Sequence, residues 1–298
     1  MFKLKKKSSG DSLSEQKRVL CTNLNFAAAE AYKLLRTNLM FSLPEQKCHV
    51  IGVSSAIRNE GKSTTSINLS YTLAETGKRV LLIEADMRLP HFARRLDLKT
   101  RPGLSNLLVG LSGENDVLQN SGFFDNWKVI TAGAVPPNPS ELLGSERMRD
   151  AIEKFSKTFD YIVIDLPPVN IVTDSLVVSK LVDGIILIAR KDYSYRQSLQ
   201  EAIGRFTVSG AKLLGLVLTH VDAPDKSYKK YSRYGRHGRY GRYGRYGKYG
   251  DGNEYGYEYG YGYGYRYGYG NGYGYGRNAK DPKKKKETGE GASVTASD

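Results

Sequence analysis

Residues 56–64 have the residue types and spacing of a phosphate-binding loop, with alanine at the first glycine position of the usual pattern. Backbone N–H groups of such a loop, and of the helix that follows it, surround phosphate oxygens. The lysine adds charge at the outer phosphates, and the hydroxyl after it ligates Mg²⁺. The alternative is a strand–turn–helix connection with an incidental lysine. The sequence predicts an ATP site with Mg²⁺, and the predicted nucleotide-binding residues here are Ala56, Glu60, Gly61, Lys62, Ser63 and Thr64.

A second segment ends a buried strand in an acid. Residues 161–165 are apolar up to Asp165, whose carboxylate could hold Mg²⁺ directly or through water. Many strands end in aspartate as a turn or cap, so this signal is weak by itself. Together with an upstream phosphate loop it predicts that Asp165 is a metal ligand and part of the catalytic set.

A third segment, residues 80–88, places two acids and an arginine after the next apolar run. Alternation along a strand puts Glu84 and Asp86 on the same side. Paired carboxylates beside a nucleotide could complete the metal site and orient or deprotonate an attacking hydroxyl. Arg88 would neutralise phosphate charge or pair with an acid. The alternative is a simple ion pair at a strand end.

The last quarter of the chain is rich in tyrosine. Of the 22 tyrosines, 17 lie between Tyr228 and Tyr275, separated mostly by glycine and basic residues. A segment with almost no aliphatic residues and many glycines cannot form a packed core. Its phenol hydroxyls are candidate phosphate acceptors, and the predicted acceptors are Tyr255, Tyr257, Tyr259, Tyr261, Tyr263, Tyr265, Tyr267, Tyr269, Tyr273 and Tyr275.

Between the ends of the chain, apolar strands alternate with helices. The patterns predict strands over 49–54, 79–86, 128–132, 161–165, 184–190 and 213–221, and helices over 30–41, 62–76 and 145–156. Continuous apolar strands separated by helices indicate an α/β fold with a doubly wound, mostly parallel sheet of the P-loop NTPase type. Ligands bind such folds at the carboxyl ends of the strands. We expect a polar basic lead over 1–20, the folded domain over 21–225 and a disordered tail over 226–298.

The formal net charge is +14, and residues 226–248 hold nine Lys/Arg and no acid. Such clusters are either solvated tails or attract anionic lipid, an acidic partner or nucleic acid. Two cysteines without metal-like spacing, Cys21 and Cys48, fit a reducing cytosol. No apolar run approaches the ~20 residues that cross a bilayer. We therefore expect a cytoplasmic protein.

Taken together, these motifs resemble the bacterial tyrosine kinases, in particular the soluble kinase subunits of Gram-positive capsule and exopolysaccharide systems. The resemblance covers residues 30–222 and the tail. It is carried by the phosphate loop, by the acidic segment 84–88, by Asp165 with the two prolines after it, by residues 136–143, and by the helix 30–38. Glu84 stands where the family usually has aspartate, and Lys33 where it has arginine.

The resemblance implies a protein-tyrosine autokinase that phosphorylates tail tyrosines of a neighbouring subunit in a ring-like homo-oligomer. It implies that Asp86 activates the incoming hydroxyl, with Lys62 and Asp165 completing the catalytic set. Assembly would use Glu30, Lys33 and Arg36. The implied partners are a membrane adaptor with an activating cytosolic segment, which would place the kinase peripherally at the inner face of the cell membrane, and a cognate phosphotyrosine phosphatase.

Two alternatives come from other classes of protein. Partition and division-site ATPases of the Min and Par type share the nucleotide fold, but their loop usually carries an additional lysine near its start, and residues 54–60 contain none. A non-catalytic scaffold could bind RNA through its Arg/Gly/Tyr tail. Intact Lys62, Asp86 and Asp165 argue against a dead enzyme, and we do not expect nucleic acid as a partner.

Overall fold

The structure is a computed structural model, and it describes residues 20–222. Its centre is a seven-stranded sheet in the order β3-β4-β2-β5-β1-β6-β7, in which every pairing is parallel except that of β3 with β4. The strands are β1 (His49–Ser55), β2 (Val80–Glu84), β3 (Gln119–Asn120), β4 (Trp127–Ile130), β5 (Tyr161–Asp165), β6 (Gly184–Arg190) and β7 (Leu213–Thr219).

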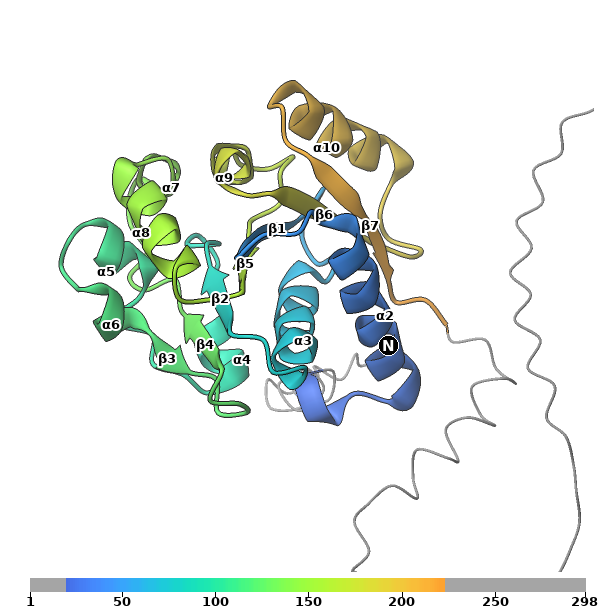
Figure 1. Ribbon diagram of the computed structural model, residues 1–298. Helices are drawn as coiled ribbons and strands as arrows, with labels where there is room; N and C mark the ends of the chain where they lie inside the picture. The colour runs from blue at the N-terminus through green and yellow to red at the C-terminus, as the bar shows by residue number, and fades with distance from the viewer. Residues whose placement is uncertain (1–19, 223–298) are drawn as a thin grey trace, which may run out of the picture. The chain divides into compact units, whose positions relative to one another are not determined.

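Helices cover the sheet on both sides (Figure 1). The α-helices are α2 (Phe26–Ser42), α3 (Lys62–Glu75), α4 (Phe92–Leu96), α5 (Leu104–Leu108), α6 (Glu114–Val117), α7 (Pro139–Leu143), α8 (Glu146–Ser156), α9 (Asp174–Val178) and α10 (Arg196–Val208), and the 3₁₀ turns are η1 (Cys21–Asn23) and η2 (Ser179–Leu181). Helices α2, α3 and α4 contribute to the core on one face, and α5, α7, α8, α9 and α10 to the core on the other.

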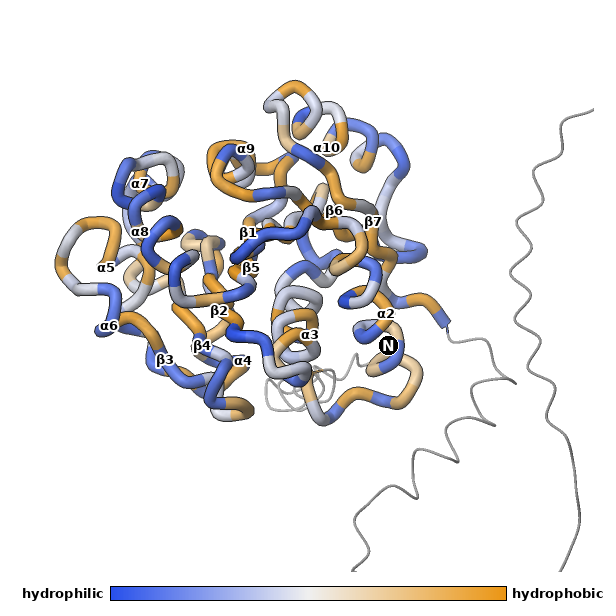
Figure 2. Tube along the Cα trace, viewed as in Figure 1, coloured by the Kyte–Doolittle hydropathy of each residue, from blue (hydrophilic) through white to orange (hydrophobic). Residues whose placement is uncertain are grey.

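Successive side chains of a strand point to opposite faces of the sheet, so each strand can contribute to both hydrophobic cores. On β2, Val80 and Leu82 pack into one core, and Leu81 and Ile83 into the other. Because both faces are buried, the central strands are continuously apolar, and Figure 2 shows hydrophobic colour along β6. This confirms the predicted fold class, a doubly wound α/β sheet of the P-loop NTPase type.

Parallel pairing brings the carboxyl ends of the strands to one edge of the sheet. Val53 of β1 and Glu84 of β2 both lie opposite Asp165 of β5 in register. Helix α3 begins at Lys62, shortly after β1 ends. The acids and the phosphate loop, distant in sequence, therefore meet at this edge.

The predicted strand over 79–86 is shorter in the structure, because β2 ends at Glu84. Beyond it, the Asp86 carboxylate accepts a hydrogen bond from the N–H of Leu89, which turns the chain away from the sheet. The lead over 1–19 and the tail from 223 onward, with all ten predicted acceptor tyrosines, lie outside the described residues. The predicted domain boundaries and acceptors stay predictions.

The three residues predicted for assembly lie on α2 in different settings. Lys33 pairs with Glu30 at 2.9 Å on the exposed surface. Arg36 instead turns inward: its guanidinium donates to the carbonyl of Thr72 at 2.7 Å, lies 3.7 Å from Glu75, and has a side chain only 17% exposed. A cation at the carboxyl end of α3 is also favoured by the helix dipole. Arg36 thus joins α2 to α3 within one subunit.

We expect Arg36→Ala to lower the free energy of unfolding by about 1.5–3 kcal/mol, because it removes a charge-assisted hydrogen bond to a backbone carbonyl. The matched change Lys33→Ala, on the same helix, should stay within about 0.5 kcal/mol. Urea unfolding at several protein concentrations measures both. Equal small effects for the two variants would show that Arg36 does not stabilise the single subunit.

Candidate active site

The phosphate loop depends on a backbone conformation that only glycine adopts easily. Gly61 has φ +99°, in the left-handed region, and a Cβ there would lie 3.3 Å from the Thr219 side chain. The turn at Gly61 directs the chain into α3, whose first N–H groups have no acceptor within the helix. These groups and the positive end of the helix dipole form an anion site of the kind that holds phosphate.

Hydrogen bonds of Glu60 stabilise the conformation of the phosphate loop. Its side chain is fully buried and accepts hydrogen bonds from the N–H of Ile57 (2.8 Å) and from the Ser194 hydroxyl. Its backbone carbonyl accepts one from the hydroxyl of Thr219 (2.7 Å), on β7. Ala56 is also fully buried, at the start of the loop. The side chains of Glu60 and Ala56 therefore shape the loop rather than line the pocket.

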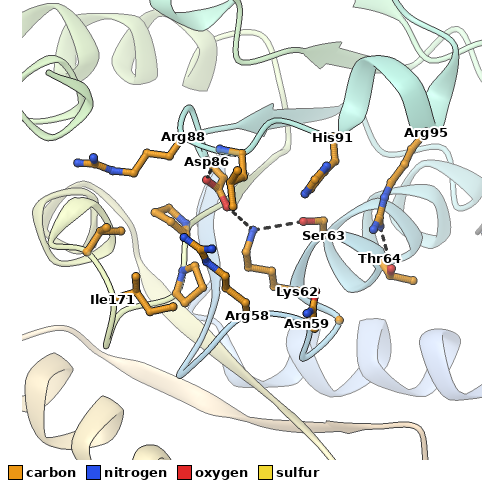
Figure 3. A pocket seen from close by; sticks show the side chains of 15 residues that line it. Arg58, Asn59, Lys62, Ser63, Thr64, Asp86, Arg88, His91, Arg95 and Ile171 are labelled. Atoms are coloured by element: carbon orange, nitrogen blue, oxygen red, sulfur yellow. Dashed lines mark hydrogen bonds and ion pairs between the residues drawn. The ribbon is translucent and has the colours of Figure 1, made fainter. Parts of the chain in front are cut away.

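Lys62 lies between two carboxylates. Its Nζ is 2.8 Å from Oδ2 of Asp86 and 3.5 Å from Oδ2 of Asp165, and its side chain is only 11% exposed. Burial lowers the pKa of Lys62, but attraction to Asp165 and Asp86 outweighs it, so the pKa is raised and the ammonium stays charged. Ser63 donates to the same Asp165 oxygen at 2.7 Å. The structure thus brings together four predicted catalytic and metal-binding residues. Three of them, Lys62, Ser63 and Asp86, are drawn in Figure 3.

Lys62, Ser63 and Asp86 line a pocket at the carboxyl edge of the sheet, and the pocket also reaches Gly61, Thr64 and Arg88. Within residues 20–222 no group of three or more His, Cys, Asp or Glu side chains is arranged to hold a metal ion. Mg²⁺ prefers oxygen ligands and is usually held by one or two carboxylates together with substrate phosphates. Asp86, Asp165 and the hydroxyl of Ser63 offer that donor set, so the residues present fit the ion.

Glu84 is directed away from this cluster. One carboxylate oxygen accepts from the N–H groups of His91 and Phe92 (2.7 Å for Phe92), and the other from the N–H of Ala132 at 3.1 Å. It is almost completely buried, and burial raises its pKa to about 7 although these N–H donors act in the opposite direction. As placed, Glu84 holds the start of α4. The metal role predicted for it remains a prediction.

Arg88 takes the second of the two roles predicted for it. It forms a two-pronged ion pair with Asp174, with Nε 2.9 Å from one oxygen and Nη2 3.0 Å from the other. Asp174 is completely buried at the start of α9 and also accepts from the Ser140 hydroxyl. Arg88 still lines the pocket, so it joins two loops at the edge of the site.

Among the pocket residues that were not predicted from the sequence are two basic side chains of the segment 91–95. Arg95, on α4, donates to the hydroxyl of Thr64 at 2.9 Å, and no ion pair of the described residues includes it. Burial lowers its pKa. His91 lies beside it and points into the pocket (Figure 3). The pair Arg94 and Arg95 was visible in the sequence, but nothing there indicates which of them turns inward.

The chain is similar to named proteins in sequence and in fold. Residues 49–207 match the model of a family described as an AAA domain. The putative tyrosine-protein kinase CapB of Staphylococcus aureus is 35% identical over 190 residues, which make up 64% of this chain and 83% of that protein. Among solved structures, the kinase domain of Escherichia coli tyrosine kinase ETK is 31% identical with a TM-score of 0.62, covering 66% of this chain and 78% of that one.

The chain belongs to the bacterial tyrosine kinase family. A further solved relative, the chimerical protein CapA2B2, is 29% identical with a TM-score of 0.65, over 70% of this chain and 91% of that one. Two longer relatives with tyrosine-kinase names are matched over 28% and 27% of their length. The protein is thus a protein-tyrosine kinase, as predicted. Neither the partition ATPase nor the non-catalytic scaffold is favoured as an alternative.

Glu84 should make the stability of the kinase depend on pH. Its pKa is about 7 in the folded kinase against an ordinary 4.5, so between these values the folded state binds more protons than the unfolded state. Stability should therefore fall as pH rises through this window, by a total on the order of 3 kcal/mol from this group. Urea unfolding without metal or nucleotide measures it. In Glu84→Gln the free energy of unfolding should vary less with pH than in the wild type. If the two proteins show the same dependence on pH, Glu84 is not the group responsible.

Arg95→Gln should weaken nucleotide binding, because a desolvated guanidinium beside the phosphate loop can make charge-assisted hydrogen bonds to phosphate. We expect about a tenfold rise in the dissociation constant for Mg-ATP, or about 1.4 kcal/mol. Calorimetric titration measures it, and the neighbouring exposed Arg94→Gln is the control. Equal affinities of the two variants for Mg-ATP would show that Arg95 does not contribute to nucleotide binding.

Proposed function

We propose that this kinase is an ATP-dependent autokinase that transfers the γ-phosphoryl group of ATP to tyrosines of its own carboxy-terminal segment. The observation that carries the proposal is the cluster of Lys62, Ser63, Asp86 and Asp165 at the amino terminus of α3. The acceptors are the glycine-spaced tyrosines between Tyr255 and Tyr275, and transfer takes place between neighbouring copies in a homo-oligomer.

In the proposed mechanism, loop N–H groups and Lys62 hold the phosphates, and Arg95 adds charge from α4. Mg²⁺, when bound, neutralises charge that develops on the phosphates. Asp86 orients the phenol and accepts its proton while the bond from the γ-phosphorus to the β-bridging oxygen breaks and a bond to the phenol oxygen forms. ADP is the leaving group. Catalysis of this kind depends chiefly on positioning and charge stabilisation.

Lys62 would act differently before and after nucleotide binds. In the structure its charge is balanced by Asp86 and Asp165. Phosphate oxygens would compete for the same ammonium group and release Asp86 to meet the phenol. Binding of the substrate would thereby help to prepare the base.

We further propose that the kinase regulates capsular or exopolysaccharide synthesis and export. Its relatives include a putative tyrosine-protein kinase in the cps region of Klebsiella pneumoniae. No helix in residues 20–222 has the length and apolar character that a bilayer span requires. A membrane adaptor with an activating cytosolic segment would hold the kinase at the inner face of the membrane, as the likeness to the CapA2B2 chimera supports. A phosphotyrosine phosphatase would reverse the modification.

The intact mass of the purified kinase after incubation with Mg-ATP tests the activity. We expect a ladder of added phosphates that maps by peptide to Tyr228–Tyr275, and its loss in Lys62→Met by at least a hundredfold in rate, since the outer phosphates lose their cation. Lys78→Met, at an exposed position, is the matched control.

Mixing active kinase with a Lys62→Met copy of different mass separates transfer between copies from transfer within one. Phosphates on the inactive copy support transfer between neighbours. If no phosphate is added even when the cytosolic segment of a candidate adaptor is present, the result would favour the partition-ATPase or the scaffold alternative.

A further inference from the structure

One side of the active-site pocket is apolar, and the phosphate chemistry gives no reason for it. Leu89 and Ile171 are 43% and 45% exposed, and both line the pocket that contains Lys62 and Asp86. Pro167 and Pro168 line the same pocket. Apolar side chains that line a pocket together with a few polar groups are candidates to contact an apolar part of a ligand.

The two aliphatic side chains come from different loops that are tied together. Leu89 follows Arg88 in the loop after β2, and Ile171 lies three residues before Asp174 in the loop after β5. The ion pair between Arg88 and Asp174, at 2.9 and 3.0 Å, joins these loops directly. The Ser140 hydroxyl donates to the same carboxylate. The ion pair therefore links the two loops that carry the apolar lining of the pocket.

The labelled side chains of the pocket lie on two sides of the Lys62–Asp86 pair. In Figure 3, Ile171, Arg88 and Arg58 lie on one side of the Lys62–Asp86 pair, and His91 and Arg95 on the other. Lys62 marks the position of the outer phosphates, and Asp86 lies 2.8 Å from it. An acceptor whose hydroxyl reaches Asp86 beside Ile171 would rest the remainder of its side chain on the apolar wall.

A tyrosine side chain has the shape and polarity for this place. Its ring is a flat apolar body, and its hydroxyl is a polar tip that needs a hydrogen-bond partner when buried. Between Tyr255 and Tyr275 all ten tyrosines have glycine on one or both sides. Such a segment offers few side chains other than the rings for recognition, so the ring must supply most of the contact.

We propose that Leu89, Pro167, Pro168 and Ile171 form a ring cradle that binds the aromatic ring of an acceptor tyrosine from the glycine-spaced repeat 255–275 and aims its hydroxyl at Asp86. The inference deepens the proposed function and rests on it. The cradle selects tyrosine because serine and threonine have no ring to fill it and their hydroxyls lie closer to the backbone.

The test uses the full-length kinase and a soluble peptide in which one tyrosine stands between glycines. We expect Leu89→Ser and Ile171→Ser each to raise the KM for the peptide at least tenfold, with kcat changed less than threefold and Mg-ATP affinity unchanged. Val208→Ser is the control, because this side chain is 90% exposed on α10 and does not line the pocket. An unchanged peptide KM in both cradle variants would overturn the proposal.

A second readout does not require transfer. The same peptide with phenylalanine in place of tyrosine should bind the wild-type kinase, measured by direct titration in the presence of a non-hydrolysable ATP analogue, and should bind each cradle variant at least tenfold more weakly. Equal binding to wild type and variants would overturn the cradle. Loss of binding in the variants without phosphate transfer by the wild type would support the cradle and contradict the kinase function.

Discussion

The arrangement of the site depends on a buried ammonium group held between two carboxylates. Removing one partner of a buried ion pair typically costs about 3–5 kcal/mol, because the remaining charge is left without compensation. Lys62 needs both Asp86 and Asp165, and each acid in turn depends on the lysine at 2.8 and 3.5 Å. The three residues come from the first helix after β1, the loop after β2 and the end of β5. The attraction of both acids to Lys62 therefore holds three separate segments at one edge of the sheet.

Other acids around the pocket accept hydrogen bonds from the backbone. Glu60 accepts from the N–H of Ile57 and Glu84 from those of His91 and Ala132, and Asp86, besides pairing with Lys62, accepts from that of Leu89. Loops at the end of a parallel sheet leave many N–H groups without a ladder partner, and buried donors without acceptors are costly. Carboxylates satisfy several donors at once. Sequence patterns cannot separate such acids from metal ligands, since both lie at strand ends.

Much of the fold and part of the site could be predicted from local sequence. The runs ending at Ser55 and Asp165 and the Gly61–Lys62 turn carry their own signals, because apolar continuity and a left-handed glycine require no knowledge of distant contacts. Helices α4 to α7 were not predicted, since helices of four or five residues are not stable alone and are formed by their packing. The pairing of Arg88 with Asp174 joins residues 86 positions apart, which periodicity cannot reveal.

The pocket combines a charged surface, which suits phosphates and a metal ion, with an apolar surface, which suits the non-reacting part of an acceptor. The phosphate loop, Lys62 and Asp165 would serve any nucleotide enzyme of this fold, because every such enzyme must hold phosphates and a metal ion. Such a surface cannot choose among hydroxyl acceptors, since charge acts on all of them alike. Selection requires contact with the part of the acceptor that does not react. In this kinase that contact is available from Leu89 and Ile171, and the ion pair between Arg88 and Asp174 joins the two loops that carry them. Residues 84–88 would thus contribute to both requirements, with Asp86 as the proposed base and Arg88 supporting the surface that would hold the acceptor.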